Sequence, residues 1–445
     1  MQKKILLWFD VEDYLTPESD DALLELLSML EESGVKATLK FCTRKMELLH
    51  TRGRMDILTK LANHEFSFHT TNHSIHPLPS EYLDQMEFAQ GAQAFHDREK
   101  PGFDRLSDLC GQHLTSYGQP GFAWAPHVFP ALRKWGVQTY LDAHDIVGID
   151  GQPFWYGGVL CYSKLNNLSH LVKDGTEGAM IRMFDQMDTT CRDTVFFSIY
   201  DHPTEFSSSV FWDEVNFQYG RNPYTYQPAP LRTVAERDAL IDQYRQFIAH
   251  TRTQPDVEYV TALESMRYEH QRQKPITVAM LDAAVAQMPT TDANYCELDG
   301  AYVCASELLG LMARRLTGRM LVPELFYGPQ KEMPSHVSGA ISVQALAEAV
   351  FSQADRVLGF KQLPVYYQVE GNLVSPADAF ATLATAIRTG AQSLALVPGR
   401  LAAADHVDRN YQFGGNWILW ADDFKGAGII EQTALQTWTL KPAVF

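Results

Sequence analysis

Acidic and histidine side chains gather in three short segments that lie far apart in the sequence. The first, FDVED, contains Asp10, Glu12 and Asp13, and the second, HEFSFHTTNHSIHP at 64–77, holds four of the fifteen histidines of the chain. The third, YDHPTEF, contains His202. An ion of the zinc type binds imidazole nitrogens and a carboxylate, and in catalytic sites it keeps one position open for water. These residue types indicate metal-dependent hydrolysis, if the fold brings the three segments together.

Spacing separates the histidines of the second segment into two candidate ligands and two structural residues. His69 and His73 are four residues apart, so a helical or turn-like backbone places both imidazoles on one side. His64 precedes the expected strand and would lie at its opposite end, and His76 stands before Pro77 in an expected turn. We therefore expect only His69 and His73 to bind a metal ion.

Segments of strand length alternate with helical segments in the first part of the chain. Strands are expected at 4–14, 35–43, 64–70, 136–145, 193–203 and 257–266, and helices at 19–35 and 45–63. The order strand, helix, strand predicts parallel strands joined by crossover helices, as in a barrel or wound sheet of about 270 residues. The carboxyl ends of such strands form one rim. Asp10, His69 and His202 all lie at such ends, so we expect them to meet there.

Composition narrows the classes of partner. The 445 residues are enough for two or three domains, and a net charge of −17 would repel nucleic acid and anionic membrane surfaces. The six cysteines lie at positions 42, 110, 161, 191, 296 and 304 and form no CxxC pair. We therefore expect free thiols and a reducing compartment. With no leader-like or membrane-spanning run visible, we expect a cytoplasmic protein without a membrane partner.

The sequence becomes rich in alanine after the charged segment RYEHQRQK, so we expect domains at 1–272 and 273–445. Two similar units follow, at about 276–316 and 341–387. ITVAMLDAAV matches ISVQALAEAV, and DGAYVCASELLGLMARRL matches EGNLVSPADAFATLATAI. Each unit predicts helix, short β-turn segment, helix, and two units can bury each other's apolar faces. The second domain is therefore expected to be smaller, mainly helical, and used for packing or homo-oligomerisation.

In their order along the chain, FDVED, HEFSFHTTNH and YDHPTEF resemble the first, second and fifth motifs of the polysaccharide deacetylase family (NodB homology domain, carbohydrate esterase type), over about 1–270. The resemblance implies an α/β fold with a distorted (β/α) barrel and metal-dependent hydrolysis of N-acetyl or O-acetyl groups, mostly on carbohydrates. It implies that His69, His73 and a first-motif carboxylate bind a divalent metal, for which we expect Zn²⁺. Asp10 would be the general base and His202 the acid that protonates the leaving group. The C-terminal units resemble, more faintly, repeats that bind pseudomurein or other cell-wall polymers.

The first motif leaves the carboxylate ligand open. The family usually has adjacent acids, whereas this chain has Asp10, Glu12 and Asp13. We expect Asp10 as base with Glu12 as ligand, because side chains two residues apart at a strand end share a face. Glu12 with Asp13 is the alternative.

The third motif departs from the family pattern. The family normally has an arginine before a proline there, and this arginine holds the base carboxylate in place. Here SYGQPGFAW has Gly118 and Gln119 before Pro120. The missing charge removes one influence on the pKa of Asp10 and argues against plain deacetylase activity.

A long segment after the fifth motif, FWDEVNFQYGRNPYTYQP at 211–228, is dense in aromatic and polar residues. Such side chains suit stacking and hydrogen bonding to sugars, and a loop above the rim could serve as a substrate lid. The candidate substrate-binding residues are Tyr200, Trp212, Asp213 and Asn216. Equally, Trp212 and Phe217 could belong to the core of a packed loop.

Three functions remain open from the sequence. The first is a metal-dependent hydrolase that removes an acetyl group from a carbohydrate or glycan precursor. The second is an amidohydrolase that cleaves a small cyclic amide, similar to allantoinases, which share this barrel. The third is a catalytically idle glycan-binding protein, suggested by the missing arginine.

Overall fold

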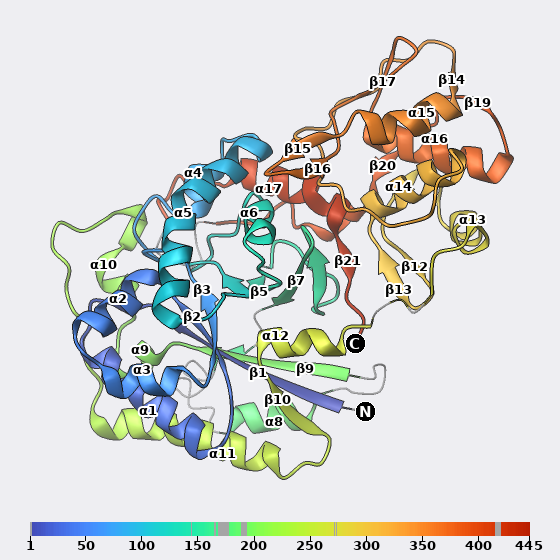
Figure 1. Cartoon of the computed structure of the whole chain (residues 1–445). Helices are drawn as coiled ribbons and strands as arrows, with labels where there is room; N and C mark the ends of the chain where they lie inside the picture. Colours follow the sequence, from blue (N-terminus) through green and yellow to red (C-terminus); the bar gives the residue numbers. More distant parts are fainter. Residues whose placement is uncertain are drawn as a thin grey trace.

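The structure is a computed structural model that describes residues 2–143, 145–163, 166–167, 178–187, 194–270, 272, 274–413 and 420–445. Its first part is one curled sheet flanked by helices (Figure 1). The parallel strands of this sheet are β1 (Gln2–Val11), β2 (Thr38–Phe41), β3 (Glu65–Phe68), β4 (Ser116–Gly118), β5 (Thr139–Ala143), β7 (Val159–Ser163), β8 (Asn166–Asn167), β9 (Thr194–Asp201) and β10 (Val257–Val260).

The sheet curls, so that strands towards its two ends come near each other. Neighbouring strands pair in the order β7-β5-β4-β3-β2-β1-β9-β8, and β10 pairs with β1 below β2. Because β8 follows closely on β7 in sequence, one short stretch of chain connects the β5 side of the sheet with the β9 side. The expected distorted (β/α) barrel is therefore confirmed.

Helices cover the outside of the barrel. In α1 (Glu18–Glu32) the predicted apolar face is buried, at Leu23, Leu26, Leu27 and Leu30, and Gly34 ends the helix with a φ of +62°. The further helices of this part are α2 (Thr43–Thr51), α3 (Met55–Leu61), α4 (Pro79–Leu83), α5 (Phe88–Cys110), α6 (Val128–Lys134), α8 (Ala179–Asp185), α9 (Pro203–Ser207), α10 (Trp212–Asn216) and α11 (Val234–Arg252).

One expected strand is half helix. The strand expected at 257–266 ends at Val260, and α12 (Ala262–Ser265) takes up the rest. Thr261 caps this helix, because its side chain accepts the N–H of Glu264 while the Glu264 carboxylate accepts the N–H of Thr261 at 3.0 Å. The sequence Thr-Ala-Leu-Glu is typical of a capping box and indicates a helix start. This local signal outweighs the strand propensity of the residues that follow.

The two sides of β1 pack differently. Leu7 and Phe9 belong to the core between the sheet and the outer helices. Leu6 and Trp8 belong to a separate apolar cluster, with side chains from β5, β7 and β9, that fills the barrel interior. Successive residues of a strand alternate between the two faces, so Asp10 points to the same interior as Trp8.

The C-terminal region contains two units of the same form. The first consists of α13 (Val278–Gln287), the hairpin β12 (Cys296–Leu298) and β13 (Ala301–Val303), and α14 (Ala305–Leu316). The second consists of α15 (Val343–Ser352), the hairpin β17 (Tyr367–Val369) and β18 (Asn372–Val374), and α16 (Pro376–Thr389). The short pairs β11 (Asp292–Ala293) with β20 (Arg400–Leu401), β14 (Ala340–Ser342) with β19 (Ser393–Ala395), and β15 (Asp355–Val357) with β16 (Phe360–Gln362) complete this region.

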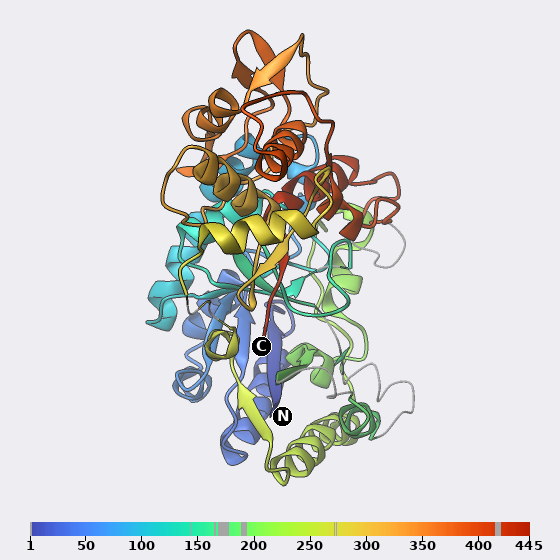
Figure 2. The same cartoon turned by 90° about the vertical axis from the view of Figure 1, so that its right-hand side faces the viewer.

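Both hairpins turn in the same way. Asp299 and Gly300 have φ values of 55° and 75°, and Glu370 and Gly371 have 51° and 83°. Two successive residues with positive φ are typical of the two-residue type I′ turn, whose twist suits a tight hairpin. Both units also contribute to one shared apolar core, separate from that of the barrel. Figure 2 shows the helices of the two units gathered at one end of the molecule.

The last part of the chain packs against the barrel. α17 (Ala427–Leu435) contributes to the barrel core through Ile429, and β21 (Lys441–Pro442) pairs antiparallel with β6 (Phe154–Tyr156), which forms a hairpin with β7. The domain boundary near 272 stays a prediction.

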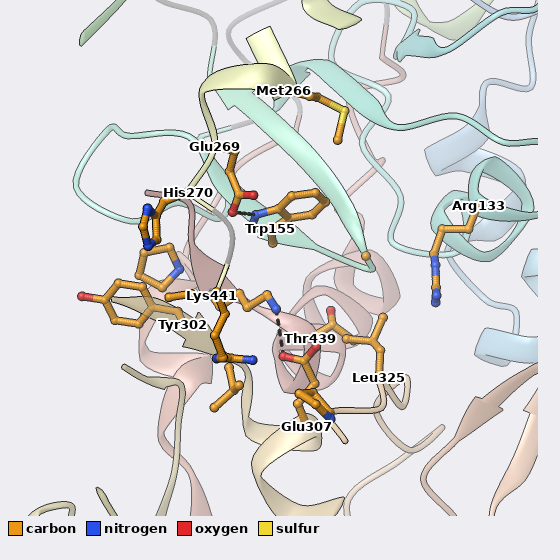
Figure 3. Close-up of a pocket in the computed structure, with 16 residues that line it drawn as sticks. Arg133, Trp155, Met266, Glu269, His270, Tyr302, Glu307, Leu325, Thr439 and Lys441 are labelled. Carbon is orange, nitrogen blue, oxygen red and sulfur yellow. Dashed lines mark hydrogen bonds and ion pairs between the residues drawn. The ribbon is translucent and has the colours of Figure 1, made fainter. Parts of the chain in front are cut away.

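A pocket of about 470 Å³ lies where the barrel meets the C-terminal region (Figure 3). Two contacts join residues that line it: Lys441 Nζ lies 2.9 Å from Glu307 Oε2, and Trp155 Nε1 donates to Glu269 Oε1 at 3.0 Å. None of the acids and histidines singled out at the rim lines this pocket.

The structure also bears on the thiols and on membrane insertion. Five cysteines are free, and Cys191 lies outside the described residues. Within the described ranges, every helix is too short or too polar to cross a bilayer.

A glycine allows α17 to approach the barrel closely. A Cβ at Gly428 would lie 1.7 Å from the backbone oxygen of Asp84, which follows α4. We expect Gly428→Ala to lower the free energy of unfolding by about 1–3 kcal/mol, because the backbone must shift to admit the methyl group. Urea denaturation measures this, with Gly148→Ala as the control, since a Cβ there meets nothing within 4 Å. Equal midpoints for the two variants would contradict the close packing.

Candidate active site

Three of the predicted ligands converge on one point. His69 Nε2 lies 2.9 Å and His73 Nε2 lies 2.8 Å from the same carboxylate oxygen, Oε2 of Glu12. All three side chains are buried, and their ligand atoms lie within 4.8 Å of one another. Two imidazole nitrogens and one carboxylate are a donor set that suits Zn²⁺.

The backbone after β3 brings the two histidines together. Thr70 has a φ of 62° and His73 a φ of 52°, a left-handed conformation that is uncommon outside glycine. The hydroxyl of Thr70 accepts the N–H of His73 at 3.2 Å and closes the turn. The two imidazole centroids therefore lie 4.7 Å apart. Strained backbone of this kind persists where the surroundings hold it, and it gathers at functional sites.

Further contacts orient the ligands. His69 Nδ1 lies 2.8 Å from the carbonyl oxygen of Gly118, so this nitrogen carries the proton and leaves Nε2 with its lone pair. Trp212 Nε1 donates to the second oxygen of Glu12 at 3.0 Å. A carbonyl that fixes an imidazole and a hydrogen bond that fixes a carboxylate both orient metal ligands, so the residues present fit a bound metal.

The second histidine is oriented by a short chain of polar groups. His73 Nδ1 contacts the hydroxyl of Ser74, which in turn donates to Asp213 Oδ1 at 2.5 Å. Asp213 Oδ2 lies 3.5 Å from His73 Nδ1. Burial raises the pKa of Asp213 to about 7, partly offset by His73. Asp213, which lies in the segment after β9, thus orients the imidazole of His73.

The four residues expected to contact the substrate are buried. Trp212, Asp213 and Asn216 are all buried, and Asn216 holds the loop together by bonding to the backbone of Trp212 and Gln227. Tyr200 is buried too, and it stacks on Trp8 at 5.0 Å between centroids. Trp212 and Phe217 are both buried, as in the alternative that places them in the core, whereas Tyr219, Tyr224 and Tyr226 of the same segment are exposed. Substrate binding by these four residues stays a prediction.

Asp13 is engaged outside the ligand cluster. Its Oδ1 accepts the backbone N–H groups of Leu15 and Thr16, both at 2.9 Å, and its Oδ2 accepts the hydroxyl of Thr204 at 2.6 Å. This is the pattern of an aspartate that holds its own loop. Of the two registers that the sequence left open, the geometry favours Asp10 with Glu12.

Asp10 lies beside the ligand cluster. Its Oδ2 is 3.5 Å from His202 Nε2 and 3.7 Å from His69 Nε2, and its Oδ1 is 2.8 Å from Lys40 Nζ. Burial raises the pKa of Asp10, but Lys40, His69 and His202 together hold it below its usual value. Asp10 is therefore ionised at neutral pH.

His202, at the end of β9, faces Asp10 across the site. Its Nδ1 lies 3.2 Å from Glu205 Oε2, which aims Nε2 at Asp10, and its ring packs edge-on against Phe211 at 4.8 Å. Burial lowers the pKa of His202, but Glu205, Glu12 and Asp10 outweigh it and raise the pKa to about 9. His202 is therefore protonated at neutral pH.

The other two histidines of the second segment are structural, as expected. His64 Nδ1 accepts the N–H of Ala37 at 3.1 Å, and burial lowers its pKa to about 4. His76 Nδ1 lies 2.7 Å from Glu81 Oε2.

Three residues of the site were missed in the sequence. Ser74 and Glu205 lie next to or near predicted residues, but a serine or glutamate in a loop gives no distinct signal. Lys40 carried a signal, since it is a charged residue at an inward position of the apolar strand TLKF.

No protein-family model and no curated protein matches the chain. Among solved structures, a probable polysaccharide deacetylase from Pseudomonas aeruginosa PAO1 is similar at 12% identity, over 60% of this chain and 90% of that one, with a TM-score of 0.42. A pseudoenzyme of the CE4 family from Bacillus anthracis is similar at 13% identity, over 59% and 65%, with a TM-score of 0.34. A 4-alpha-glucanotransferase from Thermococcus litoralis is similar at 10% identity and a TM-score of 0.42, over 60% of this chain and only 40% of that enzyme. Likeness at this level assigns neither a family nor an activity to the chain.

The charge on His202 should depend on Glu205. In metal-free protein we expect the His202 imidazole to titrate near pH 9, charged below that value and neutral above it. Glu205→Gln should move the titration down towards 6.5, because it removes one negative charge and an acceptor. NMR titration of the histidine Cε1–H signals measures this, with His50 as the exposed reference in the same spectrum. An unchanged His202 titration in the variant would contradict the assigned contact.

Proposed function

We propose that the protein is a metal-dependent hydrolase that removes an acetyl group from a nitrogen or oxygen of a carbohydrate. The observation that carries this proposal is the convergence of His69 Nε2 and His73 Nε2 on one oxygen of Glu12, with Asp10 and His202 beside them. A metal site flanked by an ionised carboxylate and a protonated imidazole has all the groups that acyl hydrolysis needs. The carbohydrate as substrate rests on the resemblance of the three motifs.

Glu12, His69 and His73 would hold the ion, and Zn²⁺ is the ion that this donor set suits best. When bound, such an ion polarises the acyl carbonyl and lowers the pKa of a water molecule from about 15.7 towards about 7. Gly118 and Ser74 keep the two imidazoles aimed at the ion.

Asp10 and His202 would divide the proton transfers. Asp10 Oδ2 accepts the proton of the water that attacks the acyl carbon, since this oxygen faces the cluster while Oδ1 faces Lys40. His202 Nε2 then donates its proton to the departing nitrogen or oxygen, and Glu205 steadies the charge on the ring. General acid and base catalysis of this kind contributes about 10²–10⁴-fold each.

Two alternatives have less support. Hydrolysis of a small cyclic amide without a metal would leave the Glu12, His69 and His73 cluster without a purpose. An idle glycan-binding barrel was suggested by the missing arginine, yet the ammonium group of Lys40 places a positive charge beside the Asp10 carboxylate. Assembly through the C-terminal region and a cytoplasmic location stay predictions.

Metal content tests the ligand set. Protein purified with added Zn²⁺ should hold one ion per chain by elemental analysis, and His69→Ala should hold none, because it removes one of three ligands. His50→Ala is the control, since His50 is exposed on α2. Wild-type protein without metal, or His69→Ala with a full equivalent, would contradict the site.

Acetate release from a panel of N-acetylated and O-acetylated oligosaccharides tests the reaction. Asp10→Asn should lower kcat by about 10²–10⁴-fold, because the amide cannot accept the proton. It should keep its metal and its KM, since Asp10 is not among the proposed ligands. Asp256→Asn, at the exposed opposite end of the barrel, is the control. No release from any substrate, or an unchanged kcat in Asp10→Asn, would overturn the proposal.

A further inference from the structure

The end of β4 offers no positive charge to the base. Gly118 has no side chain, and Gln119 is buried, with its carbonyl oxygen accepting the hydroxyl of Tyr140 at 2.8 Å. The carboxylate of Asp10, in contrast, is itself buried and needs a cationic partner.

That partner comes from the neighbouring strand β2. Lys40 and Asp10 are directly paired across the parallel β1–β2 ladder, so both side chains point into the barrel. Lys40 Nζ lies 2.8 Å from Asp10 Oδ1, and its ammonium stands over the ring of Trp8, 4.4 Å from the centroid. The Lys40 side chain is fully buried. Its charge is therefore committed to this one carboxylate among the described residues.

The Lys40 side chain takes the space that a residue on β4 would otherwise use. A Cβ at position 118 would lie 2.3 Å from Lys40 Cδ and 2.6 Å from Nζ. Gly118 has no positive φ, so its backbone would accept an ordinary side chain. What requires glycine at 118 is the lysine that lies against it.

We infer that Lys40 is the positioning residue of the base Asp10, and that Gly118 makes room for it, so that the cation reaches the base from β2 instead of β4. The inference rests on the proposed function. With Oδ1 held by the ammonium, the carboxylate keeps Oδ2 turned towards His69 and His202. Lysine contacts the carboxylate at one point, which leaves the second oxygen for the proton.

Moving the charge tests the inference. Lys40→Met should lower kcat for acetate release by about 100-fold, with KM within about threefold and metal content unchanged. Lys40→Ala combined with Gly118→Lys returns a cation from β4 into the vacated space, and should recover kcat to within about tenfold of wild type. Lys40→Ala alone and Gly118→Lys alone should each keep a low kcat, because the first lacks the charge and the second crowds the native lysine. Gly148→Ala is the control for a glycine in open space.

Stability of the metal-free protein gives a second readout that needs no activity. Lys40→Met and Asp10→Asn should each lower the unfolding midpoint, and the double variant should lose less than the sum, because each single change leaves a buried charge unpaired. Additive losses would overturn the ion pair. Full kcat in Lys40→Met, or no recovery in the relocated variant, would overturn the positioning role while the hydrolase proposal stands. Absence of acetate release by the wild type would overturn both, and the stability measurement would still show whether the pair exists.

Discussion

The burial of two carboxylates at the end of one strand is the constraint on which the rest of the site depends. Asp10 and Glu12 are 4% and 2% exposed, and each carries a negative charge that water no longer solvates. Such charges persist in a protein interior only with close partners. The partners come from strands on both sides of β1: Lys40 from β2, His69 and His73 from the loop after β3, and His202 from the end of β9.

Strand register makes this compensation possible. A slip of β2 by one residue would turn Lys40 to the outer helices and leave Asp10 facing an apolar side chain. The pairing of Asp10 with Lys40, and of Lys40 with Ser67 on β3, places a polar layer directly above the apolar layer that contains Leu6 and Trp8. The apolar layer excludes water from below, which strengthens every electrostatic contact in the layer above.

The parts of this arrangement that the sequence predicted are those determined locally. The apolar face of α1, the strand ends at Asp10 and His69, and the i, i+4 spacing to His73 are patterns within a few residues. Lys40 could not be assigned to Asp10, because their contact depends on the register of two strands. The segment at 211–228 could not be divided in advance into its buried first part, with Trp212 and Phe217, and its exposed second part, since aromatic residues suit either. The final strand β21 pairs with β6 across 286 residues of chain, a contact that no local pattern announces.

The first part of the segment after β9 contacts the cluster of Glu12, His69 and His73. Trp212 reaches back to Glu12, and Asp213 reaches through Ser74 to His73, so α10 contacts ligands that come from two other strands. A change in α10 would therefore act first on the geometry of the three residues proposed as metal ligands. The same logic applies to the absent arginine: its position on β4 matters less than the charge it would deliver. When Lys40 delivers that charge from β2, the glycine at 118 is part of the same arrangement and no sign of a lost activity.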